Sequence, residues 1–397
     1  MNILVVHETE YIEKVIFEYQ IIPELWASDG HNVYVIDYPL HRKKNPFSIA
    51  SLKTSYTTGI KKTNKKRGIT LIRPAMGHIP LIGRVFAFVQ YCFLIPRVIK
   101  QYKIDVVFLY AVPNNGLQTL CAAKRYNVPV HFRLLDVLHQ LVPNRSLRSL
   151  TFWAEKLIYP RVDELTAITP RLTKYAIKMG ANKKTTSYIP SGADKELFFA
   201  TKKDEQLMKK FNILASDKII LFSGTLYNFS GLDILITYFG KNIKLYPNYK
   251  FVIIGHGVQE KRLRQIISEY GLEKRVIMTG FIDYRQLNKY INLADVCINP
   301  FLINKTTDII FPGKIYQYLA CGKPVVASPL RGVIDIFPEN NKVGIFYAHS
   351  TSPKNTMHVI QKAIKAKVKD TNPSLQEISL ILEKRLARLV ARKQKRS

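Results

Sequence analysis

Short runs of apolar residues alternate along the chain with longer stretches in which apolar residues recur every three or four positions. The short runs predict buried strands, and the longer stretches predict helices that connect them. In the first half, strands are expected at residues 2–6, 32–38, 69–74, 104–111, 128–135, 165–169 and 186–190. Nearly continuous apolar strands that alternate with helices are typical of a parallel sheet covered on both faces.

The same pattern begins again after residue 200. Strands are expected there at 218–224, 250–257, 275–280, 295–300 and 324–328. A chain of 397 residues exceeds the roughly 250–300 residues at which single hydrophobic cores stop growing. We therefore predict an α/β fold with two Rossmann-like, doubly wound parallel-sheet domains. Ligands bind outside the carboxyl ends of such strands, so the two domains are expected to face each other across a cleft.

The domain boundary is expected in IPSGADKELF, residues 189–198, where Pro190 and Gly192 mark a hinge. The first domain is predicted to span residues 1–190, and the second residues 191–355. The remaining segment, 356–397, is basic and helical in pattern, and it is expected to pack back on the first domain.

Basic residues are in large excess, with a net charge of +31 and no Asp or Glu from Tyr38 through Ile104. Such a field attracts polyanions, which include nucleic acid, anionic lipid head groups and phosphorylated substrates. The same region holds the apolar stretch 79–99, but Arg84 and Arg97 interrupt it before the roughly 20 apolar residues that a bilayer span requires. Residues 40–103 are therefore expected to contact an anionic membrane from one side.

The four cysteines, at positions 92, 121, 297 and 321, form no CxxC pair and lie in apolar or mixed surroundings. Reduced thiols are expected rather than disulfides or a metal site, which indicates a cytoplasmic protein. The opening MNILVVHETEY has no basic lead and no small-residue cleavage site, so it predicts a first strand rather than a signal peptide.

Four longer motifs occur in a fixed order: ELWASDGHNVYVI, YIPSGADKELF, GHGVQEKRLRQIISEYGLEKRVIMTGFIDYRQLNKYINLADVCINPF and FPGKIYQYLACGKPVVAS. With them the chain resembles the retaining GT-B glycosyltransferases of family 4, over roughly residues 1–40 and 104–350. The resemblance implies an enzyme that moves a sugar from a UDP- or GDP-sugar to a lipid-linked, glycan or other cell-envelope acceptor. It implies retention of the anomeric configuration, no metal ion and no cofactor, at the inner face of the cell membrane.

The last motif has the chemistry to hold the donor diphosphate. Pro312 is favoured in a first helical turn, Gly313 lets the backbone approach a ligand, and Lys314 adds a full positive charge. We place the diphosphate at this turn, which begins at Phe311. Gln317 follows Lys314 by one helical turn on the same face and is expected to contact the ribose hydroxyls.

Three strand-end loops complete the expected donor site. Gly224 and Thr225 permit close approach of the phosphates, and Ser230 is expected to donate a hydroxyl hydrogen bond. The nucleotide base is expected against the loops that hold Gly255, Gly257 and Phe281. Relatives often carry an Arg and a Lys where this chain has Thr225 and Ser230–Gly231, and two Glu where it has Ile309 and Gln317.

The candidate catalytic residues lie in the first domain. Glu8 follows the first strand, in HETEYIEKV, which replaces the usual glycine-rich loop. Asp136 matches the position at which relatives carry an Asp after His or Arg, although Leu135 precedes it here. His139 lies one turn further. No Asp-x-Asp follows a suitable strand, which disfavours a metal-dependent mechanism.

Three other functions fit parts of these observations. A nucleotide-sugar epimerase shares the GT-B fold but needs carboxylates in the cleft, where the loops of this chain are poor in them. A catalytically degenerate binder is suggested by Thr225, Ile309 and Gln317. A nucleic-acid-binding protein fits the net charge, but no helix-turn-helix, zinc-finger or RNP-like sequence occurs. We therefore expect a nucleotide-sugar donor, an acceptor and a membrane surface as partners, and no specific nucleic acid.

Overall fold

The structure is a computed structural model that describes residues 1–13, 15–38, 53–63, 65–75, 82–110, 113–142, 144–339 and 342–395. The chain forms two compact units. Unit 1 comprises Met1–Ser191 and Leu375–Ser397, and unit 2 comprises Gly192–Ser374. Parts of the basic segment 40–103, namely 39–52 and 76–81, lie outside the described residues.

Unit 1 is built on an eight-stranded sheet with the order β3-β4-β2-β1-β5-β6-β7-β8. All of its described strand pairs are parallel except β3 with β4. The strands are β1 (Asn2–Val6), β2 (Asn32–Ile36), β3 (Ser55–Ile60), β4 (Ile69–Arg73), β5 (Val106–Leu109), β6 (Val130–Leu134), β7 (Glu164–Ala167) and β8 (Thr186–Tyr188).

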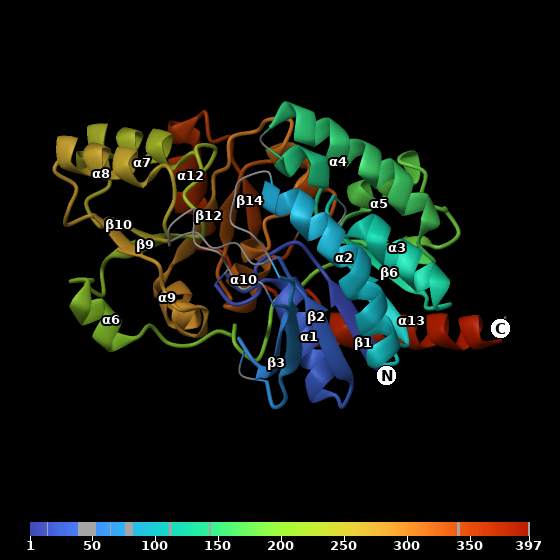
Figure 1. Ribbon diagram of the computed structural model, residues 1–397. Helices are drawn as coiled ribbons and strands as arrows, with labels where there is room; N and C mark the ends of the chain where they lie inside the picture. The colour runs from blue at the N-terminus through green and yellow to red at the C-terminus, as the bar shows by residue number, and fades with distance from the viewer. Residues whose placement is uncertain are drawn as a thin grey trace. The chain divides into compact units, whose positions relative to one another are not determined.

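The helices of unit 1 cover this sheet (Figure 1). They are α1 (Glu18–Ser28), α2 (Ile82–Gln101), α3 (Gly116–Arg125), α4 (Arg145–Ile158), α5 (Pro170–Lys178) and α13 (Leu375–Gln394), with short 3-10 turns η1 (Leu138–Leu141) and η2 (Tyr159–Arg161). Local sequence sets their starts. At α5 the Thr169 hydroxyl accepts a hydrogen bond from the amide of Leu172, and Pro170 takes the first helical position. Among the described residues, no helix is both long and apolar enough to cross a membrane.

Unit 2 has a six-stranded, wholly parallel sheet with the order β11-β10-β9-β12-β13-β14. Its strands are β9 (Lys218–Ser223), β10 (Tyr249–Ile254), β11 (Val276–Gly280), β12 (Val296–Asn299), β13 (Val325–Ala327) and β14 (Ile345–Tyr347). Its helices are α6 (Glu205–Lys210), α7 (Leu232–Lys241), α8 (Glu260–Glu269), α9 (Leu287–Leu293), α10 (Lys314–Ala320), α11 (Arg331–Ile334) and α12 (Pro353–Ala363), and its 3-10 turns are η3 (Ile243–Leu245), η4 (Tyr284–Gln286) and η5 (Thr307–Ile309).

The predicted fold class is confirmed, since both units are α/β with parallel sheets. The sequence pattern missed two edge strands, β3 and β14. Strand β3 is exposed along most of its length and shows no clear apolar run, whereas β14 is apolar but has only three residues. The C-terminal segment expected as one piece is divided, because α12 belongs to unit 2 and α13 to unit 1.

Helix α13 joins unit 1 through α1. Its residues Ile378, Leu382 and Leu386 are fully buried, and the indole Nε1 of Trp26 on α1 donates to the carbonyl oxygen of Ser379 at 3.2 Å. A hydrogen bond of 2.9 Å between His31 Nε2 and the carboxylate of Glu383 adds a second link.

Candidate active site

Three glycines at the carboxyl edge of the unit 2 sheet allow close backbone packing. A Cβ on Gly255 would lie 2.1 Å from the carbonyl oxygen of Gly224, and one on Gly257 would lie 2.3 Å from that of Leu226. Gly224 itself has a φ of +133°, and a Cβ there would lie 2.7 Å from Lys314 Nζ. The loops after β9 and β10 are therefore packed against each other, and Lys314 extends to the end of β9.

Lys314, the first residue of α10, is a cation without a carboxylate partner among the residues that the structure describes. Its Nζ lies 3.9 Å from the ring centroid of Phe222 and 4.9 Å from that of Phe301. The residue is half-buried, and burial lowers the pKa of its ammonium to about 7. A desolvated cation without a counter-ion is unfavourable, so this site is suited to an anion.

In the loop after β9, Thr225 is exposed, whereas Ser230 differs from its expected donor contact. The hydroxyl of Ser230 is buried and donates to Gln259 Oε1 at 2.5 Å, so its hydrogen holds the loop instead of pointing at a ligand. Tyr227 and Phe229 stack with their ring centroids 4.8 Å apart, and Phe229 meets Phe301 edge-on at 5.2 Å.

A row of rings that the sequence pattern did not predict lies beside Lys314 and consists of Phe222, Phe301, Phe229 and Tyr227. Its only signal was a pair of aromatic residues in a loop that otherwise holds small and polar ones. Loop spacing alone does not show which rings meet.

In the motif at 311–317, some residues are buried in the core of unit 2 and others are partly exposed. The ring of Phe311 is buried and packs 4.6 Å from the ring of Tyr316, while Pro312 is also buried. These two residues therefore hold the turn in place by packing into the core of unit 2. Gly313 caps α10 with helical backbone angles of −55° and −23°. Gln317 is half-buried. Its side-chain amide lies near the phenol of Tyr284 and opposes the rise that burial causes in the pKa of that phenol.

Phe281, directly after β11, differs from Phe311 in being 63% exposed. It follows Gly280, where a Cβ would lie 3.1 Å from the ring of His256. An open aromatic surface therefore lies at the end of β11, next to the loop that holds Gly255 and Gly257.

At the carboxyl edge of the unit 1 sheet, Glu8 joins two loops. Its carboxylate accepts hydrogen bonds from the backbone amide and the side-chain amide of Asn114, at 2.6 and 2.8 Å. Both oxygens of Glu8 are thus engaged by the loop that follows β5, which favours a positioning role.

Asp136, after β6, is half-buried and forms no hydrogen bond with any described residue. Burial raises the pKa of its carboxyl group to about 7. His139 is instead fixed, because its backbone amide and its Nδ1 contact the two oxygens of buried Glu155 at 3.1 and 2.9 Å. The hydroxyl of Tyr175 lies 3.2 Å from the same Nδ1. The structure places Asp136 and His139 in one segment, but no hydrogen bond joins them.

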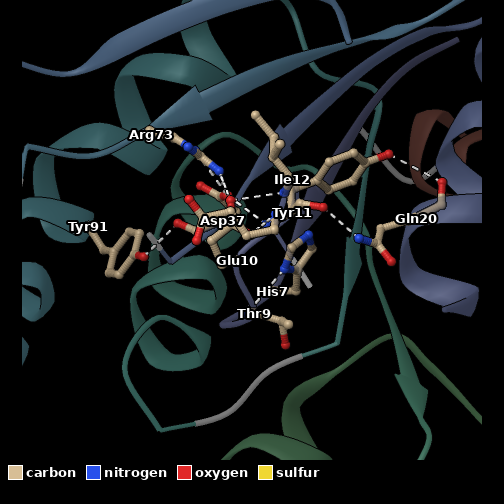
Figure 2. A network of polar contacts seen from close by, with 10 residues as sticks. His7, Thr9, Glu10, Tyr11, Ile12, Gln20, Asp37, Arg73 and Tyr91 are labelled. Carbon is tan, nitrogen blue, oxygen red and sulfur yellow. Dashed lines mark hydrogen bonds and ion pairs between the residues drawn. The ribbon is translucent and has the colours of Figure 1, made fainter. Parts of the chain in front are cut away.

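A charged network holds the loop after β1, which lacks the expected glycines (Figure 2). The carboxylate of Glu10 accepts from the amides of Ile12, at 2.9 Å, and Glu13. Asp37, after β2, accepts from the amide of Tyr11 at 2.9 Å. Arg73, at the end of β4, pairs with both Glu10 and Asp37.

Two groups in this network have shifted pKa values. Burial raises the pKa of Asp37 to about 6, against the lowering effect of Arg73. Burial lowers the pKa of His7 to about 3, so the ring is neutral between Tyr11 and Tyr19. Within the described ranges, no group of three or more His, Cys, Asp or Glu side chains is arranged to hold a metal ion.

Comparison with known proteins gives matches in both units. The family described as "Glycosyl transferases group 1" matches residues 203–377, and "Glycosyltransferase Family 4" matches residues 21–197. The alpha-monoglucosyldiacylglycerol synthase of Acholeplasma laidlawii is 26% identical over 282 residues, which cover 67% of this chain and 69% of that protein. The chain matches other curated relatives over only about half of their length or less.

Solved structures match over nearly the whole chain. The sucrose-phosphate synthase from Thermosynechococcus elongatus superposes with a TM-score of 0.71 at 16% identity, covering 98% of this chain and 99% of the other. Anabaena HepE in complex with UDP and glucose has a TM-score of 0.64 at 17% identity, covering 99% and 98%. At these identities the likeness establishes the fold.

Proposed function

Because the chain belongs to the family 4-like glycosyltransferases of the GT-B fold, we propose that it transfers a sugar from a UDP- or GDP-sugar to a lipid-linked or glycan acceptor. The observation that carries this proposal is the ammonium of Lys314, which lies beside Gly224 without a carboxylate partner among the described residues.

In the proposed reaction, the bond between the donor sugar and the diphosphate breaks, and negative charge accumulates on the departing diphosphate. A pre-positioned cation stabilises this charge more in the transition state than in the ground state. Lys314 fits that role, and in this proposal it neutralises the leaving group instead of a metal ion. A bound diphosphate would in turn hold Lys314 in its charged form.

The rest of the donor has proposed positions on either side of the diphosphate. The open ring of Phe281 and the loop that holds Gly255 and Gly257 suit the nucleotide base. Gln317 suits the ribose, because a half-buried amide both donates and accepts hydrogen bonds. Gly224, Thr225 and Gly313 line the approach of the phosphates, while Phe311, Pro312 and Ser230 act by holding the loops.

We propose Asp136 as the group in unit 1 that orients the acceptor hydroxyl. A carboxyl group whose pKa is raised to about 7 exchanges a proton near neutral pH. His139 and Glu8 support the same region through their contacts with Glu155 and Asn114. Transfer with retention is part of the proposal, and the anomeric configuration of the isolated product tests it.

The acceptor is proposed to lie at an anionic membrane, on the cytoplasmic face. The net charge of +31 and the similarity to a monoglucosyldiacylglycerol synthase both support this. Peripheral contact requires no spanning helix.

A degenerate binder remains the second candidate, because Ile309 and Gln317 stand where relatives carry carboxylates. Incubation with sugar esters of the nucleotide that binds best, with and without a diacylglycerol or glycan acceptor, separates the candidates. A transferase forms a glycolipid only with the acceptor, an epimerase alters the sugar without it, and a degenerate binder does neither.

The donor site is tested by nucleotide binding. Calorimetry with UDP, GDP, ADP and CMP is expected to show one preferred nucleotide, which names the donor class. Lys314→Met is expected to weaken that binding by about 10- to 150-fold, because one charge-assisted contact of about 1.5–3 kcal/mol is lost. Lys362→Met, which removes an exposed lysine from α12, is the matched control and should bind like the original protein. If Lys314→Met binds equally well, the diphosphate is not held there.

A further inference from the structure

Helix α2 exposes a row of apolar side chains to solvent. Val85, Val89 and Phe93 follow at four-residue spacing, and all three are exposed, Phe93 to 72%. This spacing places them on one face of the helix. The neighbouring Phe86 and Phe88 are exposed as well and widen the row. Other residues of the same helix hold it against unit 1, namely the buried Tyr91, Leu94, Ile95, Val98 and Ile99.

Helix α4 has a second row of the same kind. Leu150, Trp153 and Leu157 follow at spacings of three and four residues and are exposed, Trp153 to 60%. The residues that bury α4 lie on its other side, namely Thr151, Ala154, Glu155 and Ile158. Water therefore meets a large apolar face on each helix, which is unusual unless something covers it.

The two rows belong to one region of unit 1, because α2 and α4 both pack against α3 (Figure 1). The charge of the two helices is one-sided. Helix α2 contains no Asp or Glu, and the only acidic residue of α4 is Glu155, which is buried and bonded to His139. Exposed basic residues flank the rows at Arg97 and Lys100 on α2 and at Arg145, Arg148 and Lys156 on α4.

Trp153 and Lys156 are also paired directly. The Nζ of Lys156 lies 5.1 Å from the Trp153 ring centroid. An aromatic ring with an ammonium beside it suits the boundary between hydrocarbon and head groups, where the ring is buried and the charge meets phosphate.

We propose that α2 and α4 together form the surface on which this protein lies on a bilayer rich in anionic lipid. The proposal deepens the function proposed above, since it names the surface that would bring unit 1 to a lipid-borne acceptor. The apolar rows would enter the head-group boundary, and the basic residues would contact lipid phosphates. A bilayer fits better than a folded partner, because it needs no matching set of acidic side chains and accepts two separate apolar rows at once.

The chain offers a direct probe of this contact. It contains two tryptophans. Trp26 is fully buried and bonded to Ser379, so a change of emission on lipid binding reports Trp153. Vesicles of phosphatidylglycerol are expected to shift the emission to shorter wavelength, and brominated lipid is expected to quench it. Phosphatidylcholine vesicles and high salt should give little of either effect, since they remove the electrostatic attraction.

Sedimentation with the same vesicles tests the two rows. Leu150→Ser and Phe93→Ser are each expected to lower the vesicle partition coefficient by about tenfold, because each removes one large apolar side chain from the contact. Leu214→Ser and Val258→Ser, which change equally exposed apolar residues of unit 2, are the matched controls and should sediment like the original protein.

Several results would overturn the proposal. They are unchanged Trp153 emission with phosphatidylglycerol, equal binding to phosphatidylcholine, or equal sedimentation of the Leu150→Ser, Phe93→Ser and control variants. A shift of Trp153 emission with rising protein concentration and no vesicles would show that a second copy covers the rows. None of these measurements requires turnover. Nucleotide binding by the same variants separately reports whether the donor site of unit 2 is intact.

Discussion

At the scale of single residues, the charge of Lys314 sets a pH dependence for donor binding. Its pKa is lowered from 10.5 to about 7 by burial, so the free protein loses this positive charge as the pH rises above 7. Binding of a diphosphate requires the charged form, so the affinity for the preferred nucleotide is expected to fall by up to about tenfold per pH unit above 7. Titration calorimetry between pH 7 and 9 measures this.

Two variants separate Lys314 from other titrating groups. Lys314→Met should bind weakly with no such slope, and Lys314→Arg should keep its affinity at pH 9, because a guanidinium stays protonated. An affinity of the unchanged protein that is constant or rises over this range would contradict the role of Lys314.

The positions of candidate residues along the chain were easier to predict than their side-chain contacts. Lys314 was expected near the donor from its motif, and the structure places it beside Gly224. Ser230 and Phe311 were expected to face the donor, yet the first donates to Gln259 and the second packs against Tyr316. Sequence spacing shows which loop a side chain belongs to, whereas its direction depends on neighbours from distant parts of the chain.

At the scale of single elements, charged side chains hold the loop after β1, which is usually glycine-rich in relatives. The amides of Tyr11 and Ile12 are held by Asp37 and Glu10, and Arg73 neutralises both carboxylates (Figure 2). The sequence indicated that the glycines were absent. It did not indicate the contacts that hold the loop, because Asp37 after β2 and Arg73 at the end of β4 lie more than twenty residues away in the chain.

Arg73→Met is expected to destabilise unit 1 by about 3–5 kcal/mol, because it leaves two buried carboxylates without their cation. The pKa of Asp37 is already raised from 3.8 to about 6. A raised carboxyl pKa means that the folded protein binds the extra proton between pH 3.8 and 6. The loss in free energy of unfolding of the variant should therefore be larger at pH 8 than at pH 5, where Asp37 can be neutral.

Urea unfolding at the two pH values measures this difference. The control is Arg67→Met, since the guanidinium of Arg67 donates to Asn32 in an exposed contact, and it should change stability by less than about 1 kcal/mol. An Arg73→Met deficit that is equal at both pH values would show that Asp37 is not the group left unpaired.

At the scale of the whole molecule, the chain order and the spatial units differ at the C-terminus. Two repeats of the strand–helix pattern predicted two α/β domains, and parallel sheets follow from their apolar strands. The basic, helical C-terminal segment was expected to pack on the first domain, but the residue at which the chain returns to unit 1 depends on tertiary contacts. Helix α12 packs on α7 and β13 in unit 2, whereas α13 packs on α1 in unit 1.

This division predicts that two similar substitutions in consecutive helices destabilise different units. Leu382 on α13 and Ile360 on α12 are both fully buried, and replacement of either by Ala is expected to destabilise by about 2–5 kcal/mol. Leu382→Ala should lower the unfolding temperature of unit 1, which Trp26 fluorescence reports because Trp26 contacts α13. Ile360→Ala should instead lower the transition of unit 2, which the bound nucleotide raises. If Leu382→Ala shifted the nucleotide-sensitive transition and left the Trp26 signal unchanged, α13 would not belong to unit 1.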